Sequence, residues 1–308
     1  MEEKQKKQIQ EELQQADTKC GYVALIGRPN AGKSTLLNSL LGEKIAMVSQ
    51  KANATRKRSQ AIVMHGDDQI IFIDTPGIHE REKLLNQFML EEALKAMGDA
   101  DVIVYLAPVT DDVANYERFL EITQGKIPHI IALTKIDQVS QEKLLKKIGK
   151  YNKYSDYFKA LIPVAIPRKV GHKDLLDEIV KYLPNSPYLY DPEDLTDELV
   201  RNIYKEFIRE AIFENISDEV PYESDVIIDK IYEEPHIEKI YATIIVEKQS
   251  QKGIIIGKGG EAIKRIGRSA REKIEKLSQK QCYLNLQVTV KKGWSKDKKY
   301  LEELGYKG

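Results

Sequence analysis

The sequence has few cysteines and no long hydrophobic run. Its two cysteines, Cys20 and Cys282, are too few among 308 residues for a disulfide scaffold or a four-cysteine zinc site, so we expect no disulfide partner. The longest apolar stretch, near Val102–Val109, falls well short of the roughly 18 residues that cross a membrane. Met1–Lys19 lacks the apolar core of a secretory signal and is too acidic for a transit peptide. We therefore expect a soluble cytoplasmic protein.

The chain also has no net charge, because 48 Lys and Arg residues balance 48 Asp and Glu residues. This balance hides an asymmetry along the chain. From Glu247 to the end there are 16 basic and 7 acidic residues, whereas Asp191–Lys239 has 16 acidic and 5 basic ones. A basic C-terminal quarter on an otherwise acidic chain suggests a face that binds a polyanion, although a solvated lysine-rich surface is the alternative.

The order of apolar runs predicts two domains. Up to residue 183, short apolar runs alternate with helical patterns, which is typical of a mostly parallel six-stranded sheet between helices. Two runs, Ala61–Met64 and Ile70–Ile73, are joined by a short turn-rich link, so one edge strand is expected to be antiparallel. A polar stretch with prolines ends this pattern, and a helix predicted at Leu195–Phe213 opens an α+β arrangement. We predict a charged tail at 1–20, an α/β domain at 21–186, a linker at 187–196 and an α+β domain at 197–308.

A glycine-containing loop follows the first apolar run. Gly27–Ser34 reads G-x-x-x-x-G-K-S, between a predicted strand, Tyr22–Ile26, and a predicted helix, Ser34–Leu41. Backbone N–H groups in such a loop converge on phosphate oxygens, where the helix dipole also favours negative charge. Lys33 is expected to reach the terminal phosphates, and Ser34 is expected to bind Mg²⁺.

Two further loops follow strand-like runs in the same half of the chain. Asp74–Gly77 reads D-T-P-G, in which Asp74 can reach Mg²⁺ through water and the Gly77 N–H can contact the γ-phosphate. Thr134–Asp137 reads T-K-I-D. The Asp137 carboxylate can accept hydrogen bonds from N1–H and the exocyclic amine of guanine, a pair of donors that adenine does not offer. GTP is therefore the predicted nucleotide.

With these motifs in this order, the chain resembles the translation-factor-related GTPases, and more closely the Era family of ribosome-assembly GTPases. The resemblance runs over nearly the whole chain beyond the tail. It implies a P-loop GTPase domain followed by a type II KH domain, with GTP and GDP as ligands and Mg²⁺ as cofactor. The predicted nucleotide-binding residues are Gly27, Arg28, Pro29, Asn30, Ala31, Gly32, Lys33, Ser34, Thr35, Asp74, Thr75, Pro76, Gly77, Thr134, Lys135, Asp137 and Ala165.

The sequence departs from the family pattern in both loops that would hold the guanine. Thr134 stands where the family usually has Asn, so a hydroxyl is expected to supply the tie to the phosphate loop. Val164 and Ala165 stand where the family usually has Ser-Ala, and the Ala165 N–H is expected to bind the guanine oxygen. Guanine recognition by Asp137 is expected to survive both changes.

The resemblance also suggests a switch that closes over the metal. Lys51–Arg56 is similar to the family's K-x-x-T-T-R, with Ala54 in place of the first Thr. Thr55 is then the predicted switch residue that binds Mg²⁺, together with Ser34 and with Asp74 through water.

The position after Gly77 bears on how water is activated. Ile78 stands where a Ras-like enzyme has the Gln that orients the attacking water. GTPases with an apolar residue there and an Asn in the phosphate loop can use K⁺, and we hypothesise that Asn30 is a K⁺ ligand. The predicted catalytic residues are Lys33, Thr55, Gly77 and Asn30.

The second domain carries a glycine loop of the kind that admits a nucleic-acid backbone. Gly257–Gly260 reads G-K-G-G between an apolar half-helix and a basic helix predicted at Glu261–Leu277. Loop, helix and charge predict a site for single-stranded nucleic acid, against the alternative of a simple turn between helices. The resemblance, which includes Gln249–Gly253, implies ribosomal RNA near the 3′ end of the small-subunit molecule. The predicted RNA-binding residues are Lys252, Gly257, Lys258, Gly259, Gly260, Lys264, Arg265 and Arg268.

Motifs and resemblance together predict a GTP-hydrolysing switch that binds small-subunit ribosomal RNA near its 3′ end and assists maturation of the small ribosomal subunit. The alternative is a non-catalytic RNA-binding scaffold whose nucleotide site only supports folding. A tRNA-modifying GTPase of the same superfamily would need a tetrahydrofolate-type domain and a C-terminal cysteine, and neither is visible. Relatives also imply a peripheral contact with the inner face of the cell membrane, for which Met1–Lys19 offers few apolar residues.

Overall fold

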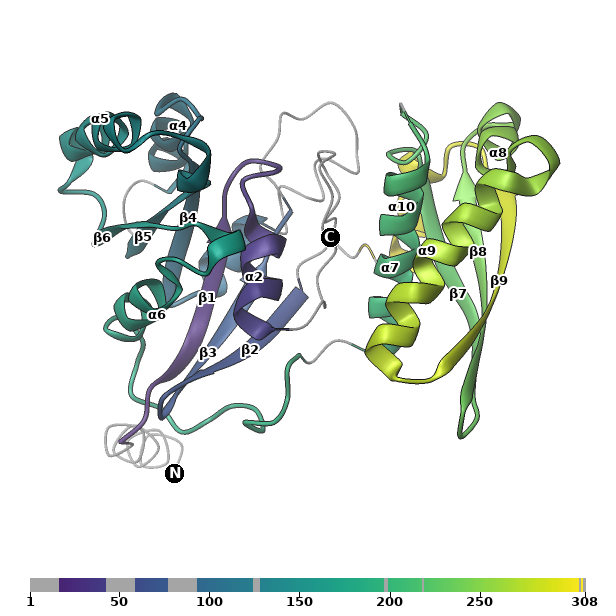
Figure 1. Ribbon diagram of the computed structural model, residues 1–308, viewed down its shortest axis with the longest axis horizontal. Helices are drawn as coiled ribbons and strands as arrows, with labels where there is room; N and C mark the ends of the chain where they lie inside the picture. The colour runs from purple at the N-terminus through teal and green to yellow at the C-terminus, as the bar shows by residue number, and fades with distance from the viewer. Residues whose placement is uncertain are drawn as a thin grey trace. The chain divides into compact units, whose positions relative to one another are not determined.

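The computed structural model describes residues 17–42, 59–76, 93–123, 128–196, 199–217, 219–304 and 306. These residues fall into two compact units, which we call the first unit (up to Thr196) and the second unit (from Leu199). Figure 1 shows an α/β arrangement in the first and a sheet with helices in the second. The predicted domain limits stay a prediction, and most of the predicted tail at 1–20 lies outside the described residues.

A six-stranded sheet forms the centre of the first unit, in the order β2-β3-β1-β4-β5-β6. All pairings among the described strands are parallel except β2 with β3, so the mostly parallel sheet with an antiparallel edge is confirmed. Every residue of β4 and of β5 is buried, as expected for central parallel strands. The strands are β1 (Cys20–Ile26), β2 (Ser59–His65), β3 (Asp68–Asp74), β4 (Val102–Pro108), β5 (His129–Thr134) and β6 (Ala160–Pro163).

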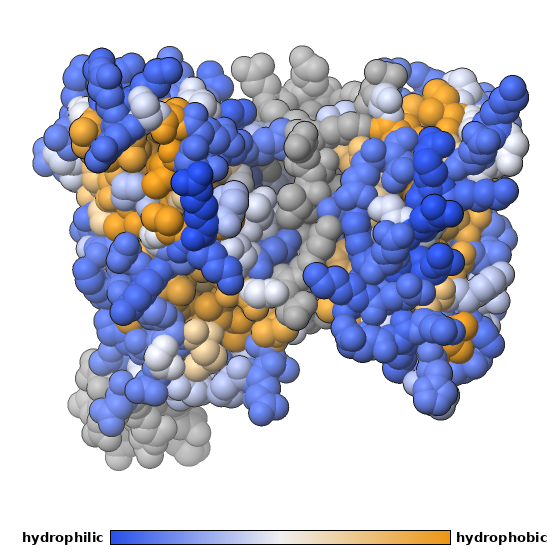
Figure 2. Space-filling model, viewed as in Figure 1, coloured by the Kyte–Doolittle hydropathy of each residue, from blue (hydrophilic) through white to orange (hydrophobic). Residues whose placement is uncertain are grey.

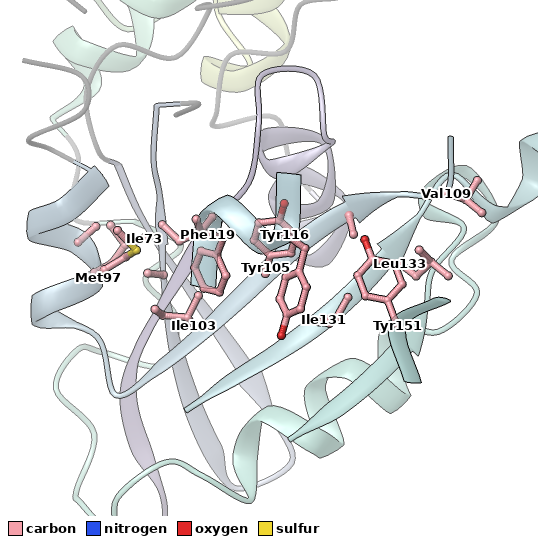
Figure 3. Packing of buried hydrophobic residues seen from close by; sticks show 14 residues of the cluster. Ile73, Met97, Ile103, Tyr105, Val109, Tyr116, Phe119, Ile131, Leu133 and Tyr151 are labelled. Atoms are coloured by element: carbon pink, nitrogen blue, oxygen red, sulfur yellow. The ribbon is translucent and has the colours of Figure 1, made fainter. Parts of the chain in front are cut away.

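Helices cover this sheet and bury an aromatic core against β4 and β5. Figure 3 shows the rings of Tyr105, Tyr116 and Phe119 gathered over these strands, with Tyr105 and Phe119 centroids 4.7 Å apart. The Tyr116 hydroxyl lies 2.8 Å from Nε2 of the buried His129. This packing fixes β4 and β5, so the loop after β5 starts from a rigid base. The helices are α2 (Lys33–Leu41), α4 (Ala114–Thr123), α5 (Gln141–Tyr151), α6 (His172–Val180) and the helical residues 93–99.

The segment predicted as a linker, 187–196, lies along β2 and β3 of the first unit. Its main anchor is Gln69, whose side chain is fully buried. The Gln69 Oε1 accepts hydrogen bonds from the backbone N–H groups of Leu189 (3.0 Å) and Tyr190 (3.1 Å), while Nε2 donates to the Tyr190 carbonyl (2.9 Å). Further along, the Ile62 N–H donates to the carbonyl of Leu195 (2.9 Å). This segment therefore covers the edge strand of the sheet.

We expect replacement of Gln69 by leucine to lower the free energy of unfolding of the first unit by about 2–4 kcal/mol. The reason is that leucine leaves two partly buried N–H groups and one carbonyl without their partner. Urea unfolding measures the loss, and limited proteolysis should show faster cleavage within 187–196. Gln141→Leu, at an exposed position of α5, is the matched control. Equal stability of the two variants would contradict this role of Gln69.

The second unit consists of a three-stranded sheet with helices, which agrees with the α+β arrangement predicted for it. β7 and β8 pair antiparallel, and β8 and β9 pair parallel. The order helix, two strands, two helices, strand is that of a type II KH domain, so this part of the fold prediction is confirmed. The elements are α7 (Val200–Asn215), β7 (Ser224–Glu233), β8 (Ile237–Val246), α8 (Gln249–Ile256), α9 (Glu261–Ser278), β9 (Gln281–Val290) and α10 (Lys298–Glu303).

Helix α7 begins later than the sequence predicts. The prediction placed its start at Leu195, whereas the structure places it at Val200. The reason is that Leu195 and Thr196 bond to the edge strand β2: the Leu195 carbonyl accepts from Ile62, and the Thr196 hydroxyl donates to the Gln60 carbonyl (2.5 Å). Backbone held in this way cannot also form a helical turn.

A buried ionic cluster attaches the C-terminal segment to α7 in the second unit. The carboxylate of the fully buried Asp225 lies 3.3 Å from the Lys205 Nζ and 3.6 Å from the Arg209 Nε. The Tyr306 hydroxyl donates to the same carboxylate (2.7 Å). Because the charges are paired, they can be buried together.

Both cysteines are free and buried, and within the described ranges no helix has the length and apolar character needed to span a bilayer.

Candidate active site and nucleic-acid interface

The loop Gly27–Gly32 connects β1 to α2 at the carboxyl edge of the sheet. The Lys33 side chain is only 6% exposed, and its Nζ donates to the carbonyls of Gly27 (3.1 Å) and Arg28 (3.2 Å). A Cβ at Gly27 would lie 2.8 Å from the Leu106 carbonyl oxygen, so β4 leaves no room for a side chain there. The loop therefore folds back over its own lysine and holds the ammonium at its centre.

Asp74 ends β3 directly beside this loop. Its Oδ2 accepts a hydrogen bond from the Ser34 hydroxyl (2.6 Å), while Oδ1 is buried and accepts none within the described residues. Burial raises the pKa of Asp74 to about 6, against the opposing effect of Lys33, and burial lowers the pKa of Lys33 to about 8. A buried carboxylate oxygen without a partner, next to a hydroxyl, is a donor set that suits Mg²⁺. Ser34 and Asp74 therefore fit the predicted metal site.

The other residues predicted to bind nucleotide near this loop differ in their contacts and in their exposure to solvent. The Arg28 guanidinium forms an ion pair with Asp111, so its side chain points away from a phosphate held by the loop. The Thr75 hydroxyl donates to the Leu25 carbonyl (2.7 Å), which ties the segment after β3 to β1. Pro29, Ala31 and Pro76 are buried, and Thr35 is exposed at the start of α2. Thr55 and Gly77 lie outside the described residues, as does the switch segment Lys51–Arg56.

The loop after β5 is tied to the phosphate loop by Thr134, as the sequence predicts, and also by Lys135, for which no such tie was predicted. The buried Thr134 hydroxyl donates to the Ala31 carbonyl (2.9 Å), and the Lys135 Nζ donates to the Asn30 carbonyl (2.8 Å). The hydroxyl thus makes the tie expected of it in place of the family's Asn. Asp137 follows in the turn Ile136–Gln138, is exposed, and makes no hydrogen bond within the described residues. Its carboxylate is therefore free to accept from a guanine.

The loop after β6 does not support the role predicted for Ala165. The Ala165 N–H donates to the Val170 carbonyl (3.1 Å), so it is not available to a guanine oxygen in this structure. Ile166 begins the short turn Ile166–Arg168, its N–H makes no hydrogen bond within the described residues, and its side chain lies against Gly32. The prediction chose Ala165 from its place in the family motif, and the sequence gives no sign that its N–H is engaged by Val170.

In the second unit, Gly257–Gly260 joins α8 to α9 as the sequence predicts. Gly257 has φ 73° and ψ 172°, and a Cβ there would lie 2.7 Å from the Ala262 Cβ. Such backbone is open almost only to glycine, so this position fixes the shape of the loop.

The sequence reasoning missed Gln251, whose buried Oε1 accepts from the N–H groups of Glu247 (3.0 Å) and Lys248 (2.9 Å) and so holds the start of α8.

The predicted basic residues lie on the open side of α9. The helix buries Ala262, Ile266, Ala270 and Ile274, whereas Lys264, Arg265 and Arg268 are exposed, as is Lys258 in the loop. Lys252 is half-buried on α8. Figure 2 shows a largely hydrophilic surface over α9. The loop and this face of α9 therefore form one surface that combines accessible backbone with positive charge.

Comparisons with known proteins find a family match for each of the two units. Residues 22–135 match the family model of the 50S ribosome-binding GTPases, and residues 208–295 match that of the KH domain. GTPase Era of Helicobacter pylori strain G27 is 54% identical over 294 residues, which cover 94% of this chain and 97% of that protein. The chain belongs to the Era family of GTPases. GTPase Era of Campylobacter concisus is 53% identical over 289 residues, covering 94% of this chain and all of that protein.

Two solved structures share the fold of this Era-family chain along almost its whole length. A variant of Aquifex aeolicus Era bound to GDP·AlF₄⁻ is 34% identical with a TM-score of 0.89, and covers 94% of this chain and 99% of its own. A crystal structure of Era with MgGDPNP and nucleotides 1506–1542 of 16S ribosomal RNA has a TM-score of 0.90, the same identity and the same coverage. Both structures hold a guanine nucleotide, and the second also holds Mg²⁺ and RNA.

Proposed function

We propose that this chain is a molecular switch that hydrolyses GTP to GDP and phosphate and couples this reaction to binding of small-subunit ribosomal RNA near its 3′ end. The proposal that the chain hydrolyses GTP rests mainly on one observation. Lys33, the Ser34–Asp74 pair and the Thr134 loop with Asp137 converge at one edge of the sheet, each held by hydrogen bonds to its neighbours. In this arrangement Lys33 would contact the phosphates, the Ser34–Asp74 pair would hold the metal ion, and Asp137 would bind the guanine.

In this proposal each residue has a separate role in the attack of water on the γ-phosphate. Lys33 balances the negative charge that develops on the phosphate oxygens. Ser34 binds Mg²⁺ directly, Asp74 binds it through water, and Thr55 and Gly77 close over the site in the GTP state. A Mg²⁺ ion held by these residues would supply positive charge that balances the charge on the phosphates. Asp137 and the N–H of Ile166, rather than that of Ala165, recognise the guanine.

Activation of water is proposed to involve K⁺, because Ile78 offers no polar group for this role. Asn30 is the candidate ligand, since its backbone lies in the left-handed region (φ 61°) at the exposed tip of the loop. Equal rates of hydrolysis in Na⁺ and K⁺ buffers would contradict this proposal.

The RNA-binding half rests on the second unit and on the relatives. An Era relative has been solved with nucleotides 1506–1542 of 16S ribosomal RNA, on a fold that this chain shares. We propose that the glycine loop and the exposed basic residues of α8 and α9 hold the same region of RNA, and that the switch assists maturation of the small subunit in the cytoplasm. Peripheral contact with the membrane through Met1–Lys19 stays a prediction about residues that are mostly outside the described ranges.

The alternative, a scaffold with a structural nucleotide site, predicts GTP binding without turnover. The buried Lys33 and the Asp74 oxygen without a partner suit a site that binds phosphate and a metal ion, because both groups cost free energy when they are buried for folding alone. Turnover of the bound GTP distinguishes the two proposals.

Selection of GTP over ATP tests the proposed role of Asp137 in recognising guanine. The protein should hydrolyse GTP and leave ATP intact. Asp137→Asn should lower GTP affinity about 100-fold, since the Asn Oδ1 can still accept from N1–H but its NH₂ group faces the exocyclic amine, so one hydrogen bond to a charged group, contributing about 1.5–3 kcal/mol, is lost. The same variant should accept xanthosine triphosphate, whose carbonyl can pair with the new amide. Asp156→Asn, exposed elsewhere in the first unit, is the control. Unchanged GTP affinity in Asp137→Asn would contradict the assigned role.

A further inference from the structure

The sheet of the second unit has two faces, and α7 and α9 cover only one. Alternate residues of β8 point toward these helices: Glu238 accepts from the Tyr204 hydroxyl of α7 (2.5 Å), and Ile240 is fully buried. The residues between them point to the opposite face. At one end of that face the C-terminal segment covers Ile245 with Trp294 and other apolar side chains.

The other end of this face carries a row of three tyrosines, one from each strand. Tyr232 of β7 and Tyr283 of β9 stand on either side of Lys239 in the register, and Tyr241 follows two residues along β8. The ring centroids of Tyr232 and Tyr241 are 6.0 Å apart, and those of Tyr241 and Tyr283 are 6.1 Å apart. Tyr232 and Tyr283 are 50% and 48% exposed. This tyrosine row is therefore an accessible aromatic surface rather than part of the core.

The tyrosine row lies between two polar hollows. The first has a volume of about 430 Å³ and is lined by Tyr232 and Tyr241 with Lys230, Asn285 and Gln287. The second, of about 740 Å³, begins at Tyr283. It also has Arg271, Lys280 and Gln281 in its wall. Amide groups next to accessible rings can bond the edges of a base whose face stacks on a ring.

The acidic groups next to the tyrosine row, and Glu275 of α9 in the wall of the second hollow, are already engaged. Asp229 accepts from the Thr243 hydroxyl (2.8 Å), Glu234 pairs with Lys239 (2.6 Å), and Glu275 accepts from the Cys282 N–H (3.0 Å). Lys230 and Lys280, on opposite sides of the tyrosine row, have no acidic partner within the described residues. The face thus offers aromatic rings at its centre and cations at its margins.

We propose that the tyrosine row is a stacking platform for single-stranded RNA, distinct from the loop Gly257–Gly260. The proposal rests on the proposed function in that it takes this unit to bind RNA. Sheets that present one aromatic ring per strand hold unstacked bases in this way, and every base has a face that can stack. A protein partner would be expected to meet an apolar centre, whereas Thr, Asn, Gln and Lys surround these rings.

The position of the tyrosine row decides which RNA can reach it. The glycine loop precedes α9, which packs on one face of the sheet, and the tyrosines lie on the other face, with β9 as the edge strand between them. A KH loop holds about four nucleotides. A short oligonucleotide therefore occupies the loop alone, and only a longer RNA can pass around β9 and stack on the tyrosine row.

Fluorescence anisotropy with two labelled RNAs tests this separation. One RNA is an oligonucleotide of about six nucleotides, enough for the loop, and the other spans nucleotides 1506–1542 of 16S ribosomal RNA. The double variant Tyr232→Ala, Tyr283→Ala should bind the long RNA about 10- to 100-fold more weakly, since each lost stacking partner costs about tenfold. Its affinity for the short RNA should not change. The corresponding Phe variants should bind both RNAs as the unaltered protein does, because stacking needs the ring and not the hydroxyl.

Tyr157→Ala, at an exposed tyrosine of the first unit, is the control for loss of an aromatic side chain. Equal affinity of the double variant and the unaltered protein for the long RNA would overturn the proposal. So would unchanged RNA affinity combined with weaker binding to the small ribosomal subunit, because the tyrosine row would then hold a protein. If the unaltered protein binds neither RNA, the proposed function itself fails, and this inference fails with it.

Discussion

Replacement of Lys33 by alanine is expected to lower the rate of GTP hydrolysis by about 10²- to 10³-fold, the usual cost of removing one preorganised group that stabilises transition-state charge. The structure gives a specific reason for so large an effect. The ammonium is nearly inaccessible to solvent and is held by the Gly27 and Arg28 carbonyls, so neither water nor a neighbouring side chain can take its place. Phosphate release under single-turnover conditions at saturating GTP measures the chemical step separately from binding.

The fold should survive this substitution. Alanine removes a buried cation whose own burial is unfavourable, and the Asp74 carboxyl can respond by a further rise in its pKa. Lys146→Ala, at an exposed position of α5, should hydrolyse GTP at the rate of the unaltered protein. A Lys33→Ala variant that folds, binds GTP and turns it over normally would show that hydrolysis does not depend on this site.

The second large effect is expected at Gly257, where alanine should weaken RNA binding at least about tenfold. A Cβ would lie 2.7 Å from the Ala262 Cβ and 2.9 Å from the Ala262 N, so the first turn of α9 must move. The backbone at Gly257 (φ 73°, ψ 172°) is also in a region that non-glycine residues adopt only at a cost of about 1–3 kcal/mol. Both effects displace the loop that the RNA backbone approaches.

Gly267→Ala is the matched control for this experiment, since it makes the same glycine-to-alanine change inside α9, ten residues after Gly257. A Cβ at Gly267 would be 3.7 Å from the Leu286 Cδ1, an ordinary contact, and alanine is preferred over glycine in a helix by about 1 kcal/mol. Its RNA affinity should therefore be unchanged while its stability rises slightly. If Gly257→Ala binds RNA as tightly as Gly267→Ala does, the loop is not the RNA site.

Much of the fold could be predicted from local patterns. The apolar runs of the first unit give the strands of its sheet, because a central parallel strand must be buried on both faces and reads as a continuous apolar stretch. The short polar link between Ala61–Met64 and Ile70–Ile73 identifies the antiparallel edge. The tie from Thr134 to the phosphate loop could also be predicted, since chemistry alone says that a hydroxyl can donate to a backbone carbonyl.

The remaining features depend on partners far away in the sequence. Gln69 bonds residues about 120 positions later, and no local pattern marks a polar residue in a strand as such an anchor. The late start of α7 has the same origin, because Leu195 and Thr196 are held by β2. That the Ala165 N–H is engaged by Val170 could not be predicted either, because backbone hydrogen bonds within a loop leave no side-chain pattern.

The tyrosine row also could not be predicted from local sequence patterns. Tyr232, Tyr241 and Tyr283 are separated by 9 and 42 residues in the sequence, and each alone is an ordinary strand residue. Only the register of three strands brings them together on one face.

The central claim is that GTP hydrolysis in the first unit is coupled to RNA on the second, and phosphate release tests it most directly. GTP and ATP are each supplied with and without RNA that spans nucleotides 1506–1542 of 16S ribosomal RNA. We predict hydrolysis of GTP alone, a higher rate with RNA, and loss of both signals in Lys33→Ala. RNA binding without hydrolysis of GTP under any salt would contradict the account and favour a scaffold with a structural nucleotide site.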